Sequence, residues 1–208
     1  MNQPPKRALI VIDVQNEYVT GNLRIEHPPI DHSLANVGRA MDAASAAGIP
    51  VIVVQHLAPE GSPIFARDSQ AAELHPQVAQ RPRDHFIQKE MASCFAGTDL
   101  ADYLKQRGID TLSVVGYMIH HCDDSTVRQA HHEGWQVELL HDATGAPPYR
   151  NAMGSATAEE IHRVFTVVMH TGFAAVLGTD DWIEALHSGE APQPDNIYLS
   201  NQRAIANR

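Results

Sequence analysis

Short apolar segments alternate with amphipathic segments along almost the whole chain of 208 residues, and this alternation limits the fold more than any other feature. Apolar runs such as ALIVIDV (8–14) are rich in β-branched residues and are typical of strands buried on both faces. Segments with helical caps and glycine stops lie between these runs. The expected strands are 8–14, 50–55, 85–88, 111–116, 135–140 and 174–177, and the expected helices are 33–47, 71–79, 98–108, 122–133, 157–170 and 179–186.

This order of elements predicts right-handed βαβ units and a parallel sheet that is covered on both faces. We therefore expect an α/β fold with a single doubly wound domain over residues 1–208 and about six parallel strands. The segment 190–208 is rich in Pro, Asn and Gln, and we expect it on the surface or against a partner subunit. Ligands of such sheets bind at the carboxyl ends of the strands, so reactive residues are sought there.

Composition excludes several classes of partner. The formal net charge is −10 and the 15 Lys and Arg residues are spread singly, so we expect no nucleic-acid partner. The longest apolar runs are of strand length, shorter than the ~20 residues that a span needs, so we expect no membrane insertion. The first residues show no secretory leader, and Cys94 and Cys122 are too few for a disulfide framework. A cytoplasmic chain with reduced thiols is the expectation.

Three of the expected strands end in or near reactive side chains. Asp13 closes the first strand, Lys89 follows the third, and Cys122 follows the strand at 111–116, where it opens a predicted helix. A thiol at a helix N-terminus faces the positive end of the helix dipole and unpaired N–H groups, which favour the nucleophilic thiolate. The alternatives remain open on local grounds: a buried thiol for Cys122, as we expect for Cys94, and a cap or ion pair for Asp13.

The order and contexts of these residues resemble those of the isochorismatase-like cysteine hydrolases, which include nicotinamidases and N-carbamoylsarcosine amidohydrolases. The resemblance covers roughly residues 8–186 and rests on four segments. These are ALIVIDVQNEY with Asp13, KEMASCFAGTDL with Lys89, VVGYMIHHCDDSTVRQAHHEGW with Cys122, and LLHDATGA with Asp142.

The resemblance implies a catalytic triad of Asp13, Lys89 and Cys122, in which Asp13 moves the proton and Lys89 holds it ionised. It also implies a cis peptide bond between Tyr117 and Met118, which would direct the N–H groups of Met118 and Cys122 at a substrate oxyanion. No metal and no cofactor are implied. Relatives form dimers or tetramers, so we expect a homo-oligomer, with Trp182 and the tail as candidate contacts.

The sequence departs from the family pattern in two places. Ile119 stands where threonine is frequent, and VVQHLAPEG stands where nicotinamidases have an Asp-x-His metal cluster, so a nicotinamidase with its metal is disfavoured. The presence of Cys122 also disfavours true isochorismatase chemistry, because those enzymes lack this cysteine. The substrate is left open. Candidate residues for the wall of its pocket are Gln15, His56, Phe95, Tyr117 and His121.

We interpret the chain as a hydrolase that cleaves a C–N bond in a small-molecule amide, carbamoyl compound or imide through a thioester intermediate. Two alternatives stay open. One is a metal-dependent hydrolase that uses the run HHCDD (120–124), although adjacent side chains point in different directions and zinc needs three or four converging ligands. The other is a catalytically silent family member that binds a small ligand.

Overall fold

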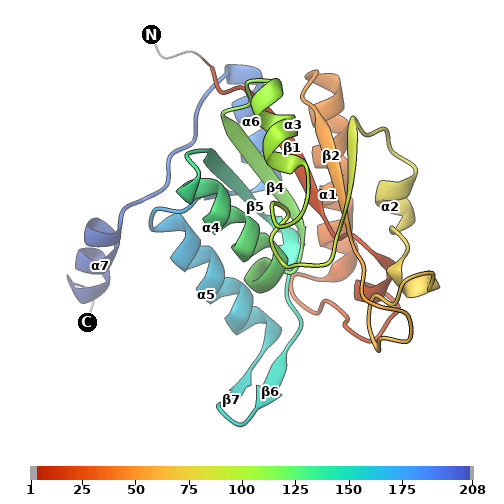
Figure 1. Ribbon diagram of the computed structural model, residues 1–208. Coiled ribbons are helices and arrows are strands. Elements are labelled where there is room, and N and C mark those ends of the chain that lie inside the picture. Colours follow the sequence, from red (N-terminus) through yellow and green to blue (C-terminus); the bar gives the residue numbers. More distant parts are fainter. Residues whose placement is uncertain (1–3, 207–208) are drawn as a thin grey trace.

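The structure is a computed structural model that describes residues 4–206. At its centre is a six-stranded parallel sheet with the order β3-β2-β1-β4-β5-β8 (Figure 1). The chain moves outward from β1 to β3, returns to the centre at β4, and then moves outward on the other side to β8. This confirms the predicted doubly wound sheet. Its strands are β1 (Arg7–Ile12), β2 (Val51–His56), β3 (His85–Lys89), β4 (Thr111–Tyr117), β5 (Gln136–Gly145) and β8 (Ala175–Leu177).

Helices cover both faces of the sheet because neighbouring residues of each strand point to opposite sides. Ile10 of β1 packs into a cluster with α3, α4 and α5, whereas Leu9 packs into a second cluster with α1, α2 and α6. The helices are α1 (Ile30–Ala46), α2 (Pro76–Ala79), α3 (Leu100–Gln106), α4 (Asp124–His132), α5 (Ala158–His170), α6 (Thr179–Ser188) and α7 (Ile197–Ala206). Within the described range, no helix has the length and apolar character needed to cross a membrane.

Strands β1 and β4 run side by side at the point where the chain direction across the sheet reverses. Their register pairs Ile12 with Gly116, so both strands end at the same level. Gly116 has a φ of 121°, and a Cβ atom there would lie 2.0 Å from the carbonyl oxygen of Ile12. Only glycine therefore allows this close approach of the two strands. The reversal point is where a doubly wound sheet opens a crevice for ligands.

Several local predictions are confirmed and others need correction. The capping box of Thr157 and Glu160 opens α5 as predicted. Ser33 is not an N-cap, because α1 begins at Ile30 and the Ser33 hydroxyl instead contacts the Ile30 carbonyl and the Tyr117 hydroxyl. Cys122 does not open a regular α-helix: it lies in a π-helical turn, η3 (Ile119–Asp123), that leads into α4.

Three elements have no counterpart in the predicted order. The short strands β6 (Tyr149–Asn151) and β7 (Gly154–Ala156) pair as an antiparallel hairpin that projects beside α5 (Figure 1). The tail after Gly189 ends in α7, which stands away from the sheet and its covering helices and has no buried residue. Trp182, expected as a subunit contact, is instead fully buried, and its indole N–H donates to Ser113 and Glu138.

Candidate active site

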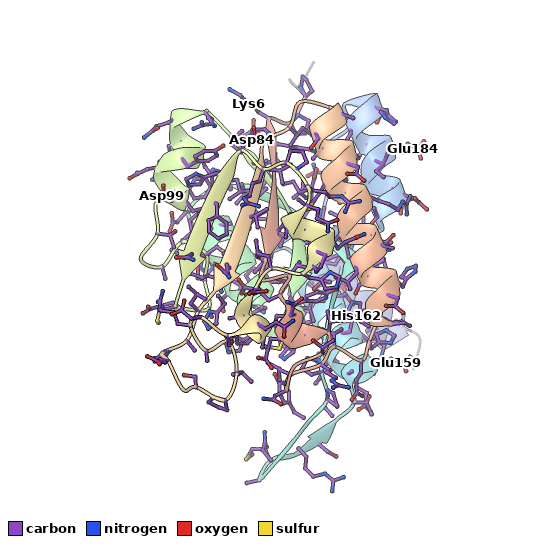
Figure 2. All side chains as sticks on the ribbon, turned by 90° about the vertical axis from the view of Figure 1, so that its right-hand side faces the viewer. Lys6, Asp84, Asp99, Glu159, His162 and Glu184 are labelled. Carbon is purple, nitrogen blue, oxygen red and sulfur yellow. The ribbon has the colours of Figure 1, made fainter. Side chains whose placement is uncertain are left out.

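The carboxyl ends of the strands form one edge of the sheet, and the reactive side chains meet there. Lys6 and Asp84, which precede β1 and β3, are labelled near the top of Figure 2, whereas Glu159 and His162 at the start of α5 are labelled near the bottom. The lower edge is therefore the carboxyl edge, and it carries the β6–β7 hairpin and the residues that follow β1, β3 and β4.

Lys89 joins the two other predicted catalytic residues. Its Nζ atom lies 2.6 Å from Oδ2 of Asp13 and 3.3 Å from Sγ of Cys122, and all three side chains are buried. The ammonium group also donates to the carbonyl oxygen of Met91 at 3.2 Å. Burial lowers the pKa of Lys89, but the negative charge of the Asp13 carboxylate, with a further contribution from the nearby Cys122, outweighs burial and raises the pKa above its ordinary value. Lys89 therefore stays protonated between its two partners.

Asp13 has one carboxylate oxygen that the fold leaves free. Its backbone has a φ of 50°, in the left-handed region, and its N–H donates to the carbonyl oxygen of Val54 at the end of β2. Oδ2 accepts the hydrogen bond from Lys89, whereas Oδ1 is buried and has no hydrogen-bond partner among residues 4–206. A buried carboxylate oxygen without a hydrogen-bond partner lowers the stability of the fold, and such unfavourable features are concentrated at functional sites. This oxygen is available to accept a proton.

The surroundings of the Cys122 thiol favour its protonated form. Burial raises its pKa, the Asp13 carboxylate raises the pKa further, and Lys89 opposes both effects without reversing them. The expectation that a helix N-terminus favours the thiolate is therefore wrong for the free protein, because Cys122 is buried and does not lie at the start of a regular helix. Deprotonation of Cys122 has to be coupled to attack, with a base within reach.

A cis peptide bond and two backbone hydrogen bonds define the conformation of the loop before Cys122. The peptide bond between Tyr117 and Met118 is cis, at the position that the family resemblance implies. The carbonyl oxygen of Met118 accepts hydrogen bonds from the N–H groups of His121 and Asp123, at 3.0 and 3.2 Å. Asp123 itself is buried, and its Oδ2 accepts a hydrogen bond of 2.6 Å from the Thr144 hydroxyl. Burial raises the pKa of Asp123 to about 7, although the bond from Thr144 acts in the opposite direction.

Two residues proposed for the pocket wall lie at the site. Nδ1 of His56 is 3.4 Å from Nζ of Lys89, and Nδ1 of His121 is 3.8 Å from Sγ of Cys122. Burial and then the charge of Lys89 lower the pKa of His56, so this ring is neutral near pH 7. Both side chains can therefore contact a molecule bound at the thiol.

The side chains of the other three candidates are engaged in contacts within the protein. The amide of Gln15 is already occupied, because it donates to the carbonyl oxygens of His56 and Ala72 and accepts from the N–H of His56. The ring of Phe95 stacks on Trp135, just before the start of β5, with 5.2 Å between ring centroids. The Tyr117 side chain points into the cluster beneath α1, where its hydroxyl bonds Ser33 at 2.7 Å.

Tyr149, which the sequence did not indicate, also reaches the nucleophile loop, where it contacts His120 of the HHCDD run. Tyr149 on the β6–β7 hairpin donates from its hydroxyl to Sδ of Met118 at 3.5 Å, and burial and then the charge of Cys122 raise the pKa of Tyr149. Nε2 of His120 lies 3.0 Å from the same hydroxyl. The turn-rich segment around Tyr149 has neither a helical nor a strand period, so nothing in the sequence placed it near Cys122.

The HHCDD run is not arranged as a metal site. Among the described residues, no group of three or more His, Cys, Asp or Glu side chains converges in a way that could hold a metal ion. Asp124 pairs with Arg128 at 2.8 Å, and Asp123 turns inward to Thr144. Cys94 is also buried, and burial raises its pKa to about 12, which suits the structural role expected for it.

Comparison with known proteins gives a consistent result. The Isochorismatase domain family matches residues 7–181. A solved structure from Burkholderia xenovorans, assigned to the isochorismatases, is 60% identical and has a TM-score of 0.98, with 99% of each chain covered. The secreted isochorismatase effector Isc1 of Verticillium dahliae is 33% identical over 68% of this chain and 77% of its own. The ureidoacrylate amidohydrolase RutB of Rhizobium rhizogenes is 28% identical over 68% of this chain and 71% of its own.

Proposed function

This chain belongs to the isochorismatase family, and we propose that it is a cysteine-dependent hydrolase of a C–N bond in a small-molecule amide, carbamoyl compound or imide. One observation carries the proposal: a buried lysine ammonium lies between the carboxylate of Asp13 and the sulfur of Cys122. This arrangement supplies a nucleophile, a base and a fixed positive charge in one place. The similarity to an amidohydrolase supports a C–N bond as the target.

The first half of the reaction forms a thioester. As Sγ of Cys122 attacks the carbonyl carbon, the thiol proton passes to Oδ1 of Asp13, the carboxylate oxygen that does not accept the hydrogen bond from Lys89. Lys89 stays protonated throughout and stabilises the negative charge as it moves from the carboxylate to the sulfur and the substrate. In this proposal the N–H groups of Met118 and Cys122 hold the oxyanion. The tetrahedral intermediate then collapses, the C–N bond breaks, and Asp13 returns the proton to the leaving nitrogen.

The second half releases the acid. A water molecule occupies the place of the departed amine or ammonia. Asp13 removes a proton from this water while the water oxygen attacks the thioester carbonyl. The C–S bond breaks, Cys122 takes back the proton as a thiol, and the carboxylic acid leaves. The same carboxylate acts as base, acid and base again, and Oδ1 of Asp13 suits this role because it has no hydrogen-bond partner among the described residues.

A panel of primary amides, carbamoyl compounds and imides tests the proposal through ammonia or amine release. We expect Cys122→Ala to lose turnover by at least about 10³-fold, as nucleophile removal does in comparable enzymes. Cys94→Ala is the matched control, because it removes the same atoms from a buried cysteine that the mechanism does not use. Full turnover by the Cys122 variant, or equal losses in both variants, would contradict the mechanism.

A further inference from the structure

A shallow groove opens beside the nucleophile loop, between the β6–β7 hairpin and α5. It has a volume of about 370 Å³ and is lined mainly by the side chains of His120, Tyr149, Met153, Ala156, Ile161 and Phe165. None of the nine residues that line it has an acidic side chain, a lysine or an arginine. Burial lowers the pKa of His120 to about 4, so this ring is also uncharged near pH 7. The groove therefore presents a neutral and largely apolar surface.

Tyr149 and His120, which line the groove, also connect it to the nucleophile loop. The hydroxyl of Tyr149 donates a hydrogen bond to Sδ of Met118, the residue that follows the cis peptide bond. The His120 ring packs against the rings of Tyr149 and Phe165, with centroids 5.2 and 5.8 Å apart, and lies two positions before the nucleophile. Its Nδ1 atom is buried and lacks a hydrogen-bond partner within residues 4–206.

The opposite side of the nucleophile has different chemistry. Asp13 follows β1 and Lys89 is the last residue of β3, whereas the groove follows β5, so the acid–base pair and the groove lie on either side of β4 and Cys122. A hollow of about 300 Å³ near the end of β3 is lined in part by Arg67, Lys89 and Glu90, all of them charged residues. A leaving nitrogen has to lie where Asp13 can protonate it. The group on the other side of the scissile carbonyl then extends away from Asp13, toward the hairpin.

We propose that the groove between the β6–β7 hairpin and α5 binds the acyl substituent of the substrate, and that this substituent is an uncharged apolar group, aromatic or branched aliphatic. The inference rests on the proposed function, because it takes Cys122 as the attacking atom and Asp13 as the acid. Aromatic rings on three of the lining residues favour flat apolar groups through edge and stacking contacts. A charged acyl group would lose its hydration in this groove without gaining a partner.

Alkylation of Cys122 tests the groove without a known substrate. The probes are 2-chloroacetamide and 2-chloroacetophenone, which both form an S–C bond to Cys122 with loss of chloride, but only the second carries a phenyl group. Each rate is measured by mass spectrometry and divided by the rate with free N-acetylcysteine. We expect a normalised preference for the phenyl probe of about tenfold or more, the range that an apolar pocket provides.

Two matched variants connect this preference to the groove. Met153→Glu places a charge in the groove at a side chain that is 94% exposed, so the fold does not depend on it. Val167→Glu makes a similar change at a 57% exposed site on α5 that does not line the groove. We expect Met153→Glu to reduce the preference several-fold and Val167→Glu to leave it unchanged. A normalised preference near one, or equal behaviour of the two variants, would overturn the inference.

The result separates this inference from the proposed function. Amide turnover that depends on Cys122, combined with no preference for the phenyl probe, refutes the groove assignment alone. A clear phenyl preference at Cys122 with turnover that survives Cys122→Ala refutes the proposed function and leaves a binding groove.

Discussion

Replacement of Lys89 by methionine removes the charge that joins the catalytic residues while keeping a side chain of similar length. The ammonium lies 3.3 Å from the sulfur of Cys122 and 2.6 Å from the carboxylate of Asp13. Two unit charges 3.3 Å apart interact by about 5 kcal/mol at an effective dielectric constant of ~20. Part of this energy offsets the cost of burying the lysine, so we expect a loss of about 4 kcal/mol in transition-state stabilisation, or about 10³-fold in kcat.

Loss of turnover has to be separated from loss of folding. Lys89→Met leaves the Asp13 carboxylate buried without its counter-ion, and breaking such a pair costs about 3–5 kcal/mol of stability. The double variant Asp13→Asn, Lys89→Met removes both charges, and we expect it to recover much of that stability while remaining inactive. The assay compares ammonia release and urea denaturation for the single and double variants. A folded Lys89→Met protein that retains more than about a tenth of the wild-type kcat would refute the reasoning.

Three further predictions concern other parts of the structure. Burial raises the pKa of Asp123 to about 7, so between about pH 4 and 7 the folded protein holds a proton there that the unfolded chain releases. The free energy of unfolding therefore falls by up to about 4 kcal/mol as the pH rises through this window. We expect Asp123→Asn to flatten the pH dependence of the stability measured by urea unfolding. Glu138→Gln leaves the buried Arg7 guanidinium without its counter-ion and should lower the free energy of unfolding by about 3–5 kcal/mol. Asp42→Asn changes an ion pair whose acid is 62% exposed, and it should lower the free energy of unfolding by less than about 1 kcal/mol in the same denaturation assay. We also propose that α7 packs on another copy of this chain, because its apolar side chains Ile197 and Tyr198 are 74% and 69% exposed. Removal of residues 197–208 should reduce the mass of the assembly measured by light scattering, and a monomeric full-length chain would contradict this proposal.

The sequence predicted the part of the site that depends on topology. Asp13, Lys89 and Cys122 lie at or after the ends of three strands of one parallel sheet, and parallel strands end at one edge whatever side chains surround them. The distances that join the three residues could not be predicted, because they depend on the left-handed backbone of Asp13 and the π-helical turn at Cys122. Neither conformation has a distinctive residue pattern. Burial, which the local sequence around Cys122 does not reveal, raises the pKa of this thiol against the expected direction.

The wall of the pocket was harder to predict because it depends on side-chain direction. Tyr117 belongs to a strand that is buried on both faces, and its register turns the ring toward α1 and away from the site. Phe95 lies in an irregular segment that returns toward the start of β5, where its ring stacks on Trp135. Tyr149 reaches Met118 from the first strand of the β6–β7 hairpin, which follows β5 at the carboxyl edge of the sheet, and the short strands of the hairpin lack an alternating pattern.

The central claim is that Cys122 carries the acyl group during turnover, and trapping that intermediate tests it most directly. The protein is mixed for milliseconds with an amide that it hydrolyses, and the reaction is quenched in acid. The protein is then digested and its peptides are analysed by mass spectrometry. We predict that the peptide containing Cys122 gains the mass of the acyl group, that the peptide containing Cys94 does not, and that the adduct is absent from Cys122→Ala. Turnover without any adduct on Cys122, or an adduct on another residue, would contradict the account.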